Sequence, residues 1–537
     1  MDLKYSFSSR RSAVMSNRGM VATGQPLAAQ AGVSMLLQGG NAVDAAIAAA
    51  AALNVVEPMA TGLGGDTFAL IYLSNSGELK ALNASGRAPY AANLEVFRGL
   101  GYREMPGMGI HSVTIPGALD GWCSMLDEYG TMNLAQVFAP AIELAEHGFP
   151  VTEVIGHTWN KFSSMLKLDA NAEHTYLKAG MAPQSGDIVM QPELAGTFKK
   201  IAESGRDVFY RGEIAEAIVA CSQENGGLIT MQDLNDHTST WVTPISTKYR
   251  GYDIYECPPN GQGLVALMGL NILEGYDLQS LGHNSPAYLH LLIEAIKLAF
   301  ADADRYVADP DFVDIPLKSL ISKSYAERRR NLIDVNNVQQ KVAAGNPDTE
   351  GDTVYLAVTD SAGNSVSFIS SLYRPFGSGI VVGGTGICLQ NRGSLFSLEA
   401  GHPNCIEPHK RPYHTIIPAM AFKDGKLFLT FGVMGGFMQP QGHIQVLLNI
   451  IDFSMDMQTA LDAPRFRYIQ GNESAFEAGI SPDVLRELVN RGHIIAELDD
   501  PYSQEFGGGQ TIMIHPSNRT LIAGSDPRKD GCAIGVW

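Results

Sequence analysis

The sequence changes from polar to apolar within Gly351-Asp352-Thr353-Val354-Tyr355-Leu356-Ala357-Val358. The apolar residues after Thr353 have the composition of a β-strand. Residues 359–364 form a predicted turn, and residues 365–370 alternate polar and apolar side chains as a returning strand does. The stretch therefore predicts a β-hairpin that Thr353 opens. A threonine at the start of a strand is most often there only because threonine favours β-strands. Its flanking residues must show whether it also has a functional role.

The flanks of Thr353 resemble those of one enzyme family. Asp360-x-x-Gly363-Asn364-x-Val366 follows the threonine, and this pattern resembles the γ-glutamyltransferase family, including its cephalosporin acylase branch. The resemblance runs from about Arg18 to the C-terminus. It implies an α+β fold, the four-layer αββα sandwich of N-terminal nucleophile (Ntn) hydrolases, with a large helical portion.

Other elements follow from local patterns. Residues 26–37 read as a helix, and Asn41 is a plausible N-cap for a second helix over residues 42–53. Core-facing helical periodicity marks Leu134 to His147 and Pro286 to Tyr306. We expect most of residues 120–350 to be helical.

Composition excludes several partners. The chain has 537 residues, and 38 Lys+Arg against 56 Asp+Glu give a net charge of −18, so neither nucleic acid nor an anionic membrane is an expected partner. Six scattered cysteines without CxxC spacing argue against a zinc ribbon or a disulfide framework. Residues 1–20 lack the apolar core of a signal peptide, and residues 45–56 are too short for a membrane span of about 20 residues. We therefore expect a cytoplasmic protein.

The N-terminal third contains a glycine-rich run, Thr61-Gly62-Leu63-Gly64-Gly65-Asp66. The glycines precede a strand instead of opening a helix, which argues against a dinucleotide site. The resemblance places a similar run near the active site; alternatively, the glycines let two segments approach closely. The family arginine that binds a substrate α-carboxylate falls on Ser85, so Arg87 is the nearest candidate for that role. A structural ion pair is the alternative for Arg87.

The resemblance implies that Thr353 is a catalytic nucleophile. Its hydroxyl attacks an amide carbonyl, and its own α-amine, with a reference pKa near about 8, moves the proton. That amine exists only after the chain is cut between Asp352 and Thr353. Ser371 stands where the family has a threonine that hydrogen-bonds the nucleophile. Backbone amides of Gly435 and Gly436 are the oxyanion-hole candidates, and a strand-end turn is the alternative.

Cleavage would yield a large piece, residues 1–352, and a small piece, residues 353–537, intertwined as one domain. The expected partners are a small-molecule amide substrate and the other cleaved piece, giving an αβ heterodimer; a dimer of heterodimers is left open. No cofactor is expected. The chemistry requires the Thr353 hydroxyl to lie open at a cavity, with Gly435 and Gly436 close to it.

Departures from the family concern substrate binding. The aspartate that binds the γ-glutamyl α-amino group aligns with Leu395, and an ammonium beside leucine would lack its counter-ion. Arg392 replaces a glutamine or glutamate, Tyr373 replaces an asparagine, and His414 and Thr415 replace paired serines. These five residues make glutathione-like donors poor candidates. Arg392 could instead meet a carboxylate, as in a glutaryl amide, the pattern of the acylase-like branch.

Two other interpretations stay open at this stage. The chain could be an unprocessed, catalytically silent homologue that binds a peptide or metabolite. It could also be a metalloenzyme using Asp302 and Asp304, although such a cluster at a helix end is more often a solvated or ion-paired face. We expect no metal site.

Overall fold

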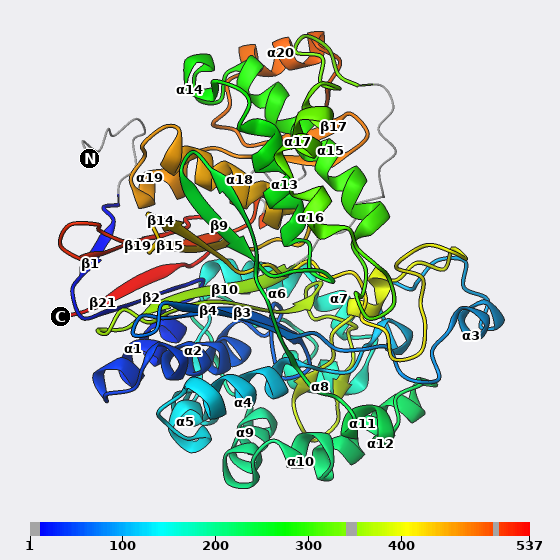
Figure 1. Cartoon of the computed structure of the whole chain (residues 1–537). Helices are drawn as coiled ribbons and strands as arrows, with labels where there is room; N and C mark the ends of the chain where they lie inside the picture. Colours follow the sequence, from blue (N-terminus) through cyan, green and yellow to red (C-terminus); the bar gives the residue numbers. More distant parts are fainter. Residues whose placement is uncertain (1–10, 340–351, 498–503) are drawn as a thin grey trace.

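The computed structural model describes residues 11–339, 352–497 and 504–537. Two seven-stranded antiparallel sheets lie face to face, and helices cover the outer face of each (Figure 1). The predicted four-layer αββα sandwich is confirmed.

The strands of each sheet come from both ends of the chain. The first sheet has the order β21 (Cys532–Val536), β2 (Gly19–Thr23), β10 (Asp352–Thr359), β11 (Ser365–Tyr373), β3 (Asp66–Leu73), β4 (Glu78–Ala84), β7 (Thr240–Val242). The second sheet has the order β1 (Val14–Ser16), β20 (Leu521–Ser525), β19 (Gly509–Ile514), β15 (Lys426–Val433), β14 (Ala419–Lys423), β9 (Tyr252–Glu256), β8 (Ile245–Tyr249).

The two helical layers form from different parts of the chain. Against the first sheet lie α1 (Pro26–Leu37), α2 (Ala42–Val56) and α4 (Ala118–Tyr129), with α5 (Leu134–His147) and α9 (Pro192–Ser204) further out. Against the second sheet lie α13 (Gly263–Leu273), α18 (Met438–Ile451) and α19 (Met457–Asp462), with α15 (Pro286–Tyr306), α17 (Lys323–Arg330) and α20 (Pro482–Asn490) further out. The helices predicted over Leu134 to His147 and Pro286 to Tyr306 have these same bounds in α5 and α15.

Shorter elements complete the molecule. They include helices α3 (Leu94–Gly99), α6 (Glu153–Lys161), α8 (Ala170–Tyr176), α11 (Glu213–Glu224) and α12 (Met231–Asn235), the 3-10 helix η2 (Arg392–Leu395), and the small sheet β16 (Phe466–Gln470), β17 (Glu473–Phe476), β18 (Ile494–Ile495).

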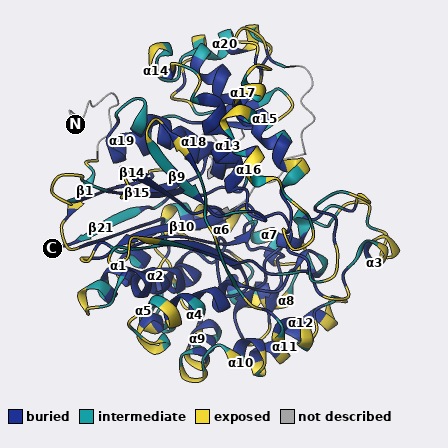
Figure 2. Cartoon of the chain, viewed as in Figure 1, coloured by how far each residue is buried: buried dark blue, intermediate teal, exposed yellow. Residues whose placement is uncertain are grey.

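Strand β10 shows why the sandwich has several cores. Val354, Leu356 and Val358 point to the core that the first sheet shares with α2, whereas Tyr355 and Ala357 point to the core between the sheets. Successive side chains of a strand face opposite sides, so a strand buried on both faces reads as a continuous apolar run. Figure 2 shows the sheets buried and the exposed residues gathered on outer helices and loops.

The hairpin turn is tied to helix α2. Asp360 Oδ1 accepts the amides of Ala362 (2.9 Å) and Asn364 (3.0 Å), while its Oδ2 accepts the amide of Ala42, the first residue of α2 (3.1 Å). Asn41 caps the same helix, as predicted. The Asp-x-x-Gly-Asn pattern therefore shapes the turn and also satisfies a helix terminus.

Candidate active site

Thr353 lies at an irregularity in the pairing of β10 with β11. Asp352 pairs with Tyr373 and Val354 with Ser370, and the register shifts between them. Bulges of this kind redirect a side chain and are frequent beside active sites. Here the Thr353 Oγ1 lies 3.2 Å from the Ser371 Oγ, so the sequence-predicted pair is brought together.

The Thr353 side chain is wholly buried in this intact chain. The expectation of a hydroxyl open at a cavity is wrong for this state, in which the peptide bond from Asp352 to Thr353 is still present. An uncut chain needs its hydroxyl next to its own backbone, not next to solvent.

Tyr373 and Arg392 form a stacked pair beside this hairpin. Tyr373 has a positive φ of 82°, which is uncommon for a bulky residue, and its amide donates to the Ser371 Oγ (2.7 Å). The Arg392 guanidinium lies 4.5 Å from the centre of the Tyr373 ring. The backbone that orients Ser371 therefore also presents the ring on which Arg392 rests.

Arg392 is fully buried and under-satisfied. Its Nη1 donates to the Thr415 Oγ1 (2.7 Å), while its Nε and Nη2 have no hydrogen-bond partner within residues 11–339, 352–497 and 504–537. Burial lowers the pKa of Arg392 to about 10, with the charge of Asp66 acting in the opposite direction. A planar fork with two open donors is suited to a carboxylate.

The ring of His414 is hydrogen-bonded within the protein. Its Nε2 donates to the Asp66 Oδ2 (3.0 Å), and its Nδ1 accepts the amide of Ile416 (3.3 Å). Burial and the Arg392 charge lower its pKa to about 4, so the ring is neutral at pH 7. Both ring nitrogens are bonded to the protein, so the prediction of His414 as a substrate-binding residue is not supported.

Gly435 and Gly436 form the turn from β15 into α18. Their φ angles are 109° and 58°, a region that favours glycine, and a side chain on Gly435 would lie 3.1 Å from the Gly507 Cα. No described residue accepts a hydrogen bond from either glycine amide. α18 also has no side-chain cap at its N-terminus. Open amides at a helix N-terminus are suited to an anion.

Two sets of contacts connect this turn with the hairpin that Thr353 opens. Ser367 of β11 donates to the carbonyl of Phe431 in β15, the strand that leads into the turn (3.4 Å). A chain of contacts then ends two residues from Ser371, running through Gly436, Gln262, Thr415, Arg392 and Tyr373.

The glycine-rich run lies directly against this site. A side chain on Gly65 would lie 2.5 Å from the carbonyl of Ser371, and one on Gly64 would lie 2.0 Å from the carbonyl of Cys388. The two alternatives for this run are therefore compatible, because its glycines allow close approach to another segment and that segment belongs to the site. Asp66, its last residue, accepts the amides of Gly86 (2.8 Å) and Gly117 (3.2 Å).

Arg87 has a different environment from the one expected of a substrate ligand. Its guanidinium lies 3.9 Å from the Asp311 carboxylate and donates to the Thr238 carbonyl (3.3 Å). Within the described residues, no hydrogen bond or ion pair joins Arg87 to Thr353 or Arg392. The structural ion pair, the alternative to carboxylate binding, is the arrangement present.

The metal interpretation finds no support in the part of the chain that is described. No group of three or more His, Cys, Asp or Glu side chains there could hold a metal ion. Asp302 is paired with Arg329 (3.0 Å), and Asp304 lies 4.0 Å from His402. Within the same residues, no helix has the length and apolar character needed to cross a membrane.

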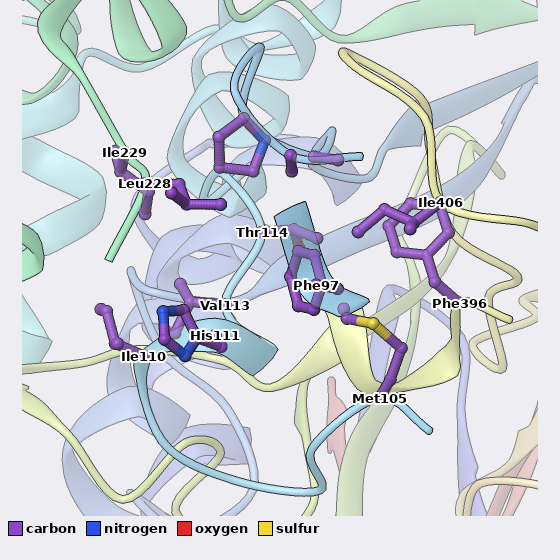
Figure 3. Close-up of a pocket in the computed structure, with 14 residues that line it drawn as sticks. Phe97, Met105, Ile110, His111, Val113, Thr114, Leu228, Ile229, Phe396 and Ile406 are labelled. Carbon is purple, nitrogen blue, oxygen red and sulfur yellow. The ribbon is translucent and has the colours of Figure 1, made fainter. Parts of the chain in front are cut away.

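A narrow pocket is lined in part by Gly393 of η2. Figure 3 shows its mainly apolar lining, which includes Phe97, Met105, Leu228, Phe396 and Ile406. The buried Thr114 hydroxyl on its wall has no partner among the described residues. The pocket does not include Thr353, Ser371 or Arg392, so it is not the reaction site.

Two residues of the site were not predicted from the sequence. Gln262 and Asp66 make contacts across it, and each sits inside a glycine-rich loop where sequence reasoning attended to the glycines. The available signal was a polar side chain next to a strongly apolar element: helix α13 follows Gln262 and strand β3 begins at Asp66.

Comparison with known proteins agrees with this geometry. The family model described as Gamma-glutamyltranspeptidase matches residues 28–536. The chain belongs to this family. The predicted enzyme class, an amide hydrolase or acyltransferase of the family, is confirmed.

Three relatives of the family are similar along their whole lengths. The glutathione hydrolase-like YwrD proenzyme of Bacillus subtilis is 39% identical, covering 97% of this chain and 99% of that protein. The acylase ACY 1 proenzyme of Pseudomonas sp. strain SE83 is 35% identical, covering 99% and 96%. The crystal structure of cephalosporin acylase from Bacillus halodurans has a TM-score of 0.93 and 44% identity, covering 99% and 98%.

Proposed function

We propose that this chain is a self-cleaving proenzyme whose Thr353 hydrolyses or transfers acyl groups that carry a carboxylate but no α-ammonium. The observation that carries the substrate class is Arg392, a buried guanidinium with two open donors stacked on Tyr373. Three features support the catalytic part: the Thr353–Ser371 contact, the open amides of the Gly435–Gly436 turn, and relatives named as proenzymes.

Self-cleavage begins within the intact chain. The Thr353 Oγ attacks the carbonyl carbon of Asp352, the C–N bond between the two residues breaks, and an ester forms while the hydroxyl proton passes to the leaving nitrogen, which becomes the α-amine of Thr353. Water then hydrolyses the ester, leaving a carboxylate on Asp352 and both a free hydroxyl and a free α-amine on Thr353. Ser371 orients the hydroxyl, because its own position is set by the amide of Tyr373.

The freed amine then serves external substrates. It takes the proton from the Thr353 Oγ as that oxygen attacks the substrate amide. The amides of Gly435 and Gly436 donate to the oxyanion, and each such donor is typically worth about 3 kcal/mol of barrier. The proton passes to the leaving amine, and water or an acceptor amine releases the acyl group from Thr353.

Arg392 selects the acyl group. A substrate carboxylate would accept from its Nε and Nη2 and offset the cost of a buried cation. Leu395, three residues further along η2, supplies no counter-ion for an α-ammonium. Glutaryl-like amides are therefore better donors than γ-glutamyl amides, in line with an acylase relative and not with glutathione hydrolysis.

The two pieces are proposed to stay together after cleavage. β10 and β11 of the small piece lie between β2 and β3 of the large piece in one sheet, so separation would break hydrogen-bonded strand pairs on both sides. A dimer of these heterodimers stays a prediction.

Gel electrophoresis and N-terminal sequencing test the processing step. The wild-type chain should give two bands, the smaller beginning at Thr353, and the Thr353→Ala chain should give one. A single full-length band from an active wild-type preparation would refute N-terminal threonine catalysis. An intact and inactive wild-type chain would favour the silent binding homologue.

Three p-nitroanilides test the substrate class. Glutaryl, γ-glutamyl and butyryl p-nitroanilide differ only in the carboxylate and the ammonium of the acyl group. We expect kcat/KM to be highest for the glutaryl compound. Equal or better turnover of the γ-glutamyl compound would contradict the exclusion of an α-ammonium. Equal turnover of the butyryl compound would contradict the role given to Arg392. Either result would leave the role of the nucleophile intact.

A further inference from the structure

The side chain of Gln262 spans two parts of the site. Its Nε2 donates to the carbonyl of Thr415 (2.7 Å) and to the carbonyl of Gly436 (2.9 Å). Its Oε1 accepts the hydroxyl of Tyr413 (3.1 Å). The side chain is fully buried, and both its amide hydrogens and its oxygen are engaged.

The two carbonyls belong to segments with different roles. Thr415 supplies the hydroxyl that accepts from Arg392, so it belongs to the carboxylate pocket. Gly436 belongs to the turn whose open amides face the oxyanion. Gln262 is itself anchored, because its backbone amide donates to the His414 carbonyl (2.9 Å).

The glycine turn needs such a support. Gly435 and Gly436 have no side chains with which to fix their own peptide planes, and glycine is the most mobile residue type. On its far side the turn is tied by the amide of Met434, which donates to the Gly508 carbonyl (2.9 Å). On the near side, Gln262 is the side chain that bonds the turn to the carboxylate pocket.

We infer that Gln262 is a positioning residue that sets the distance between the carboxylate pocket and the oxyanion turn, and so the acyl chain length that reacts. The inference rests on the proposed function. A substrate held by its carboxylate at Arg392 reaches the turn with its carbonyl only when its chain matches that distance. A displacement of about 1 Å in such an arrangement can cost about 100-fold in rate.

The test uses cleaved enzyme and a series of succinyl, glutaryl and adipyl p-nitroanilides. Wild-type enzyme should prefer one chain length by more than about tenfold. Gln262→Met keeps the length of the side chain but removes its donors, and it should lower kcat for the preferred compound by about 10- to 100-fold. KM should change little, and the preference among chain lengths should fall below about threefold. Rates are expressed per cleaved chain.

Gln445 provides a matched control. It is also a buried glutamine whose Nε2 bridges two carbonyls, those of Gln441 (3.2 Å) and Phe466 (3.0 Å), and both of these residues lie outside the proposed site. Gln445→Met should leave both kcat and the chain-length preference within about twofold of wild type. Equal profiles for the Gln262→Met and Gln445→Met enzymes would overturn the inference.

Tyr413→Phe keeps the test decisive if Gln262→Met does not fold. It removes only the hydroxyl that holds the Gln262 Oε1, so kcat should fall a few-fold and the chain-length preference should weaken. An unchanged profile in this variant would also overturn the inference. A wild-type enzyme that shows no preference for carboxylate-bearing acyl groups would instead refute the proposed function.

Discussion

Two buried arginines, Arg392 and Arg465, differ in how the protein surrounds them. Arg465 Nη1 donates to the carbonyls of Phe506 (3.1 Å) and Gly507 (3.3 Å), and its Nη2 pairs with the Asp526 carboxylate at 2.7 Å. Among the described residues, Arg392 has one hydrogen bond, to Thr415, and one stacked ring, that of Tyr373. Both are essentially inaccessible to solvent.

The difference indicates that Arg465 has a structural role and that Arg392 is suited to binding a ligand. Arg465 is satisfied by its own chain and holds the 506–507 segment, against which the Gly435 turn packs. Arg392 is held in place but left with unused donors, an arrangement that costs stability unless a ligand completes it. A buried charge with incomplete bonding is therefore a better indicator of a binding site than a buried charge alone.

The largest expected effect is the loss of folding stability when Arg465 is replaced. Arg465→Met leaves the Asp526 carboxylate buried beside fewer partners and should lower the free energy of unfolding by about 3–5 kcal/mol. Arg392→Met should leave it unchanged or raise it by about 1 kcal/mol or more, because it removes a poorly compensated cation. Denaturant unfolding of both variants in an uncut Thr353→Ala background measures the two free energies of unfolding. Equal losses of free energy in the two variants would contradict the proposed difference between Arg465 and Arg392.

The reverse pattern is expected in catalysis. Arg392→Met should lower kcat/KM for glutaryl p-nitroanilide roughly 30-fold to several thousand-fold, because the substrate carboxylate loses its partner. This range corresponds to a loss of about 2–5 kcal/mol in transition-state stabilisation. Butyryl p-nitroanilide, which lacks that carboxylate, is the control and should be turned over at the wild-type rate. A similar loss on both compounds would mean that Arg392 supports the fold of the site and does not bind substrate.

Acid should affect the two regions in different pH ranges. The His414 pKa lies near 4 in the folded chain and near about 6.5 when unfolded, so the unfolded chain binds more protons between these values. The free energy of unfolding should therefore fall, by up to about 3 kcal/mol, as the pH drops from about 6.5 to 4. Burial also lowers the pKa of His237 to about 4, which acts in the same direction. His414→Gln should therefore reduce this dependence, and not remove it, in a pH series of unfolding curves.

Asp526 should respond only at lower pH. Burial raises the pKa of Asp526, but Arg465 and Arg528 outweigh that effect and keep it below its usual value of 3.8. Its stabilising contribution is present above that value and is lost as the pH falls through the lower, folded pKa. A free energy of unfolding that falls as steeply between pH 6.5 and 4 in His414→Gln as in the wild type would assign the transition to other groups, such as His237.

The smallest expected effect concerns Leu395. It lies three residues from Arg392 in the 3-10 helix η2, where such residues share a face. Leu395→Asp should place a carboxylate of the protein beside Arg392. It should lower kcat/KM for the glutaryl anilide by about tenfold, which corresponds to about 1.4 kcal/mol. It should raise kcat/KM for the γ-glutamyl anilide. Leu395→Asn controls for polarity without charge. Unchanged kinetics in both variants would place Leu395 outside the donor site.

Sequence reasoning predicted much of the frame. The hairpin opened by Thr353, the Asn41 cap and the helices α5 and α15 all follow from signals within a few residues, such as turn chemistry, capping and periodicity. It also brought Thr353 to Ser371, since residues of one hairpin pair across a short turn.

The same reasoning was weaker wherever partners are distant in the chain. Arg87 was a reasonable carboxylate ligand by residue type, but the fold pairs it with Asp311. His414 was a reasonable substrate ligand by alignment, but Asp66 and Ile416 occupy its nitrogens. Neither outcome has a local signal, because the deciding neighbours come from other elements.

By itself, the sequence determined the strand that Thr353 opens and the turn and caps around it. Only the tertiary structure decided that Thr353 is enclosed, that two donors of Arg392 have no partner among the described residues, and that Gln262 connects Thr415 to the glycine turn. The physical reason is range. Propensity and capping act over one or two helical turns, whereas the bond from Gln262 to Thr415 joins residues 153 positions apart, which only packing brings together.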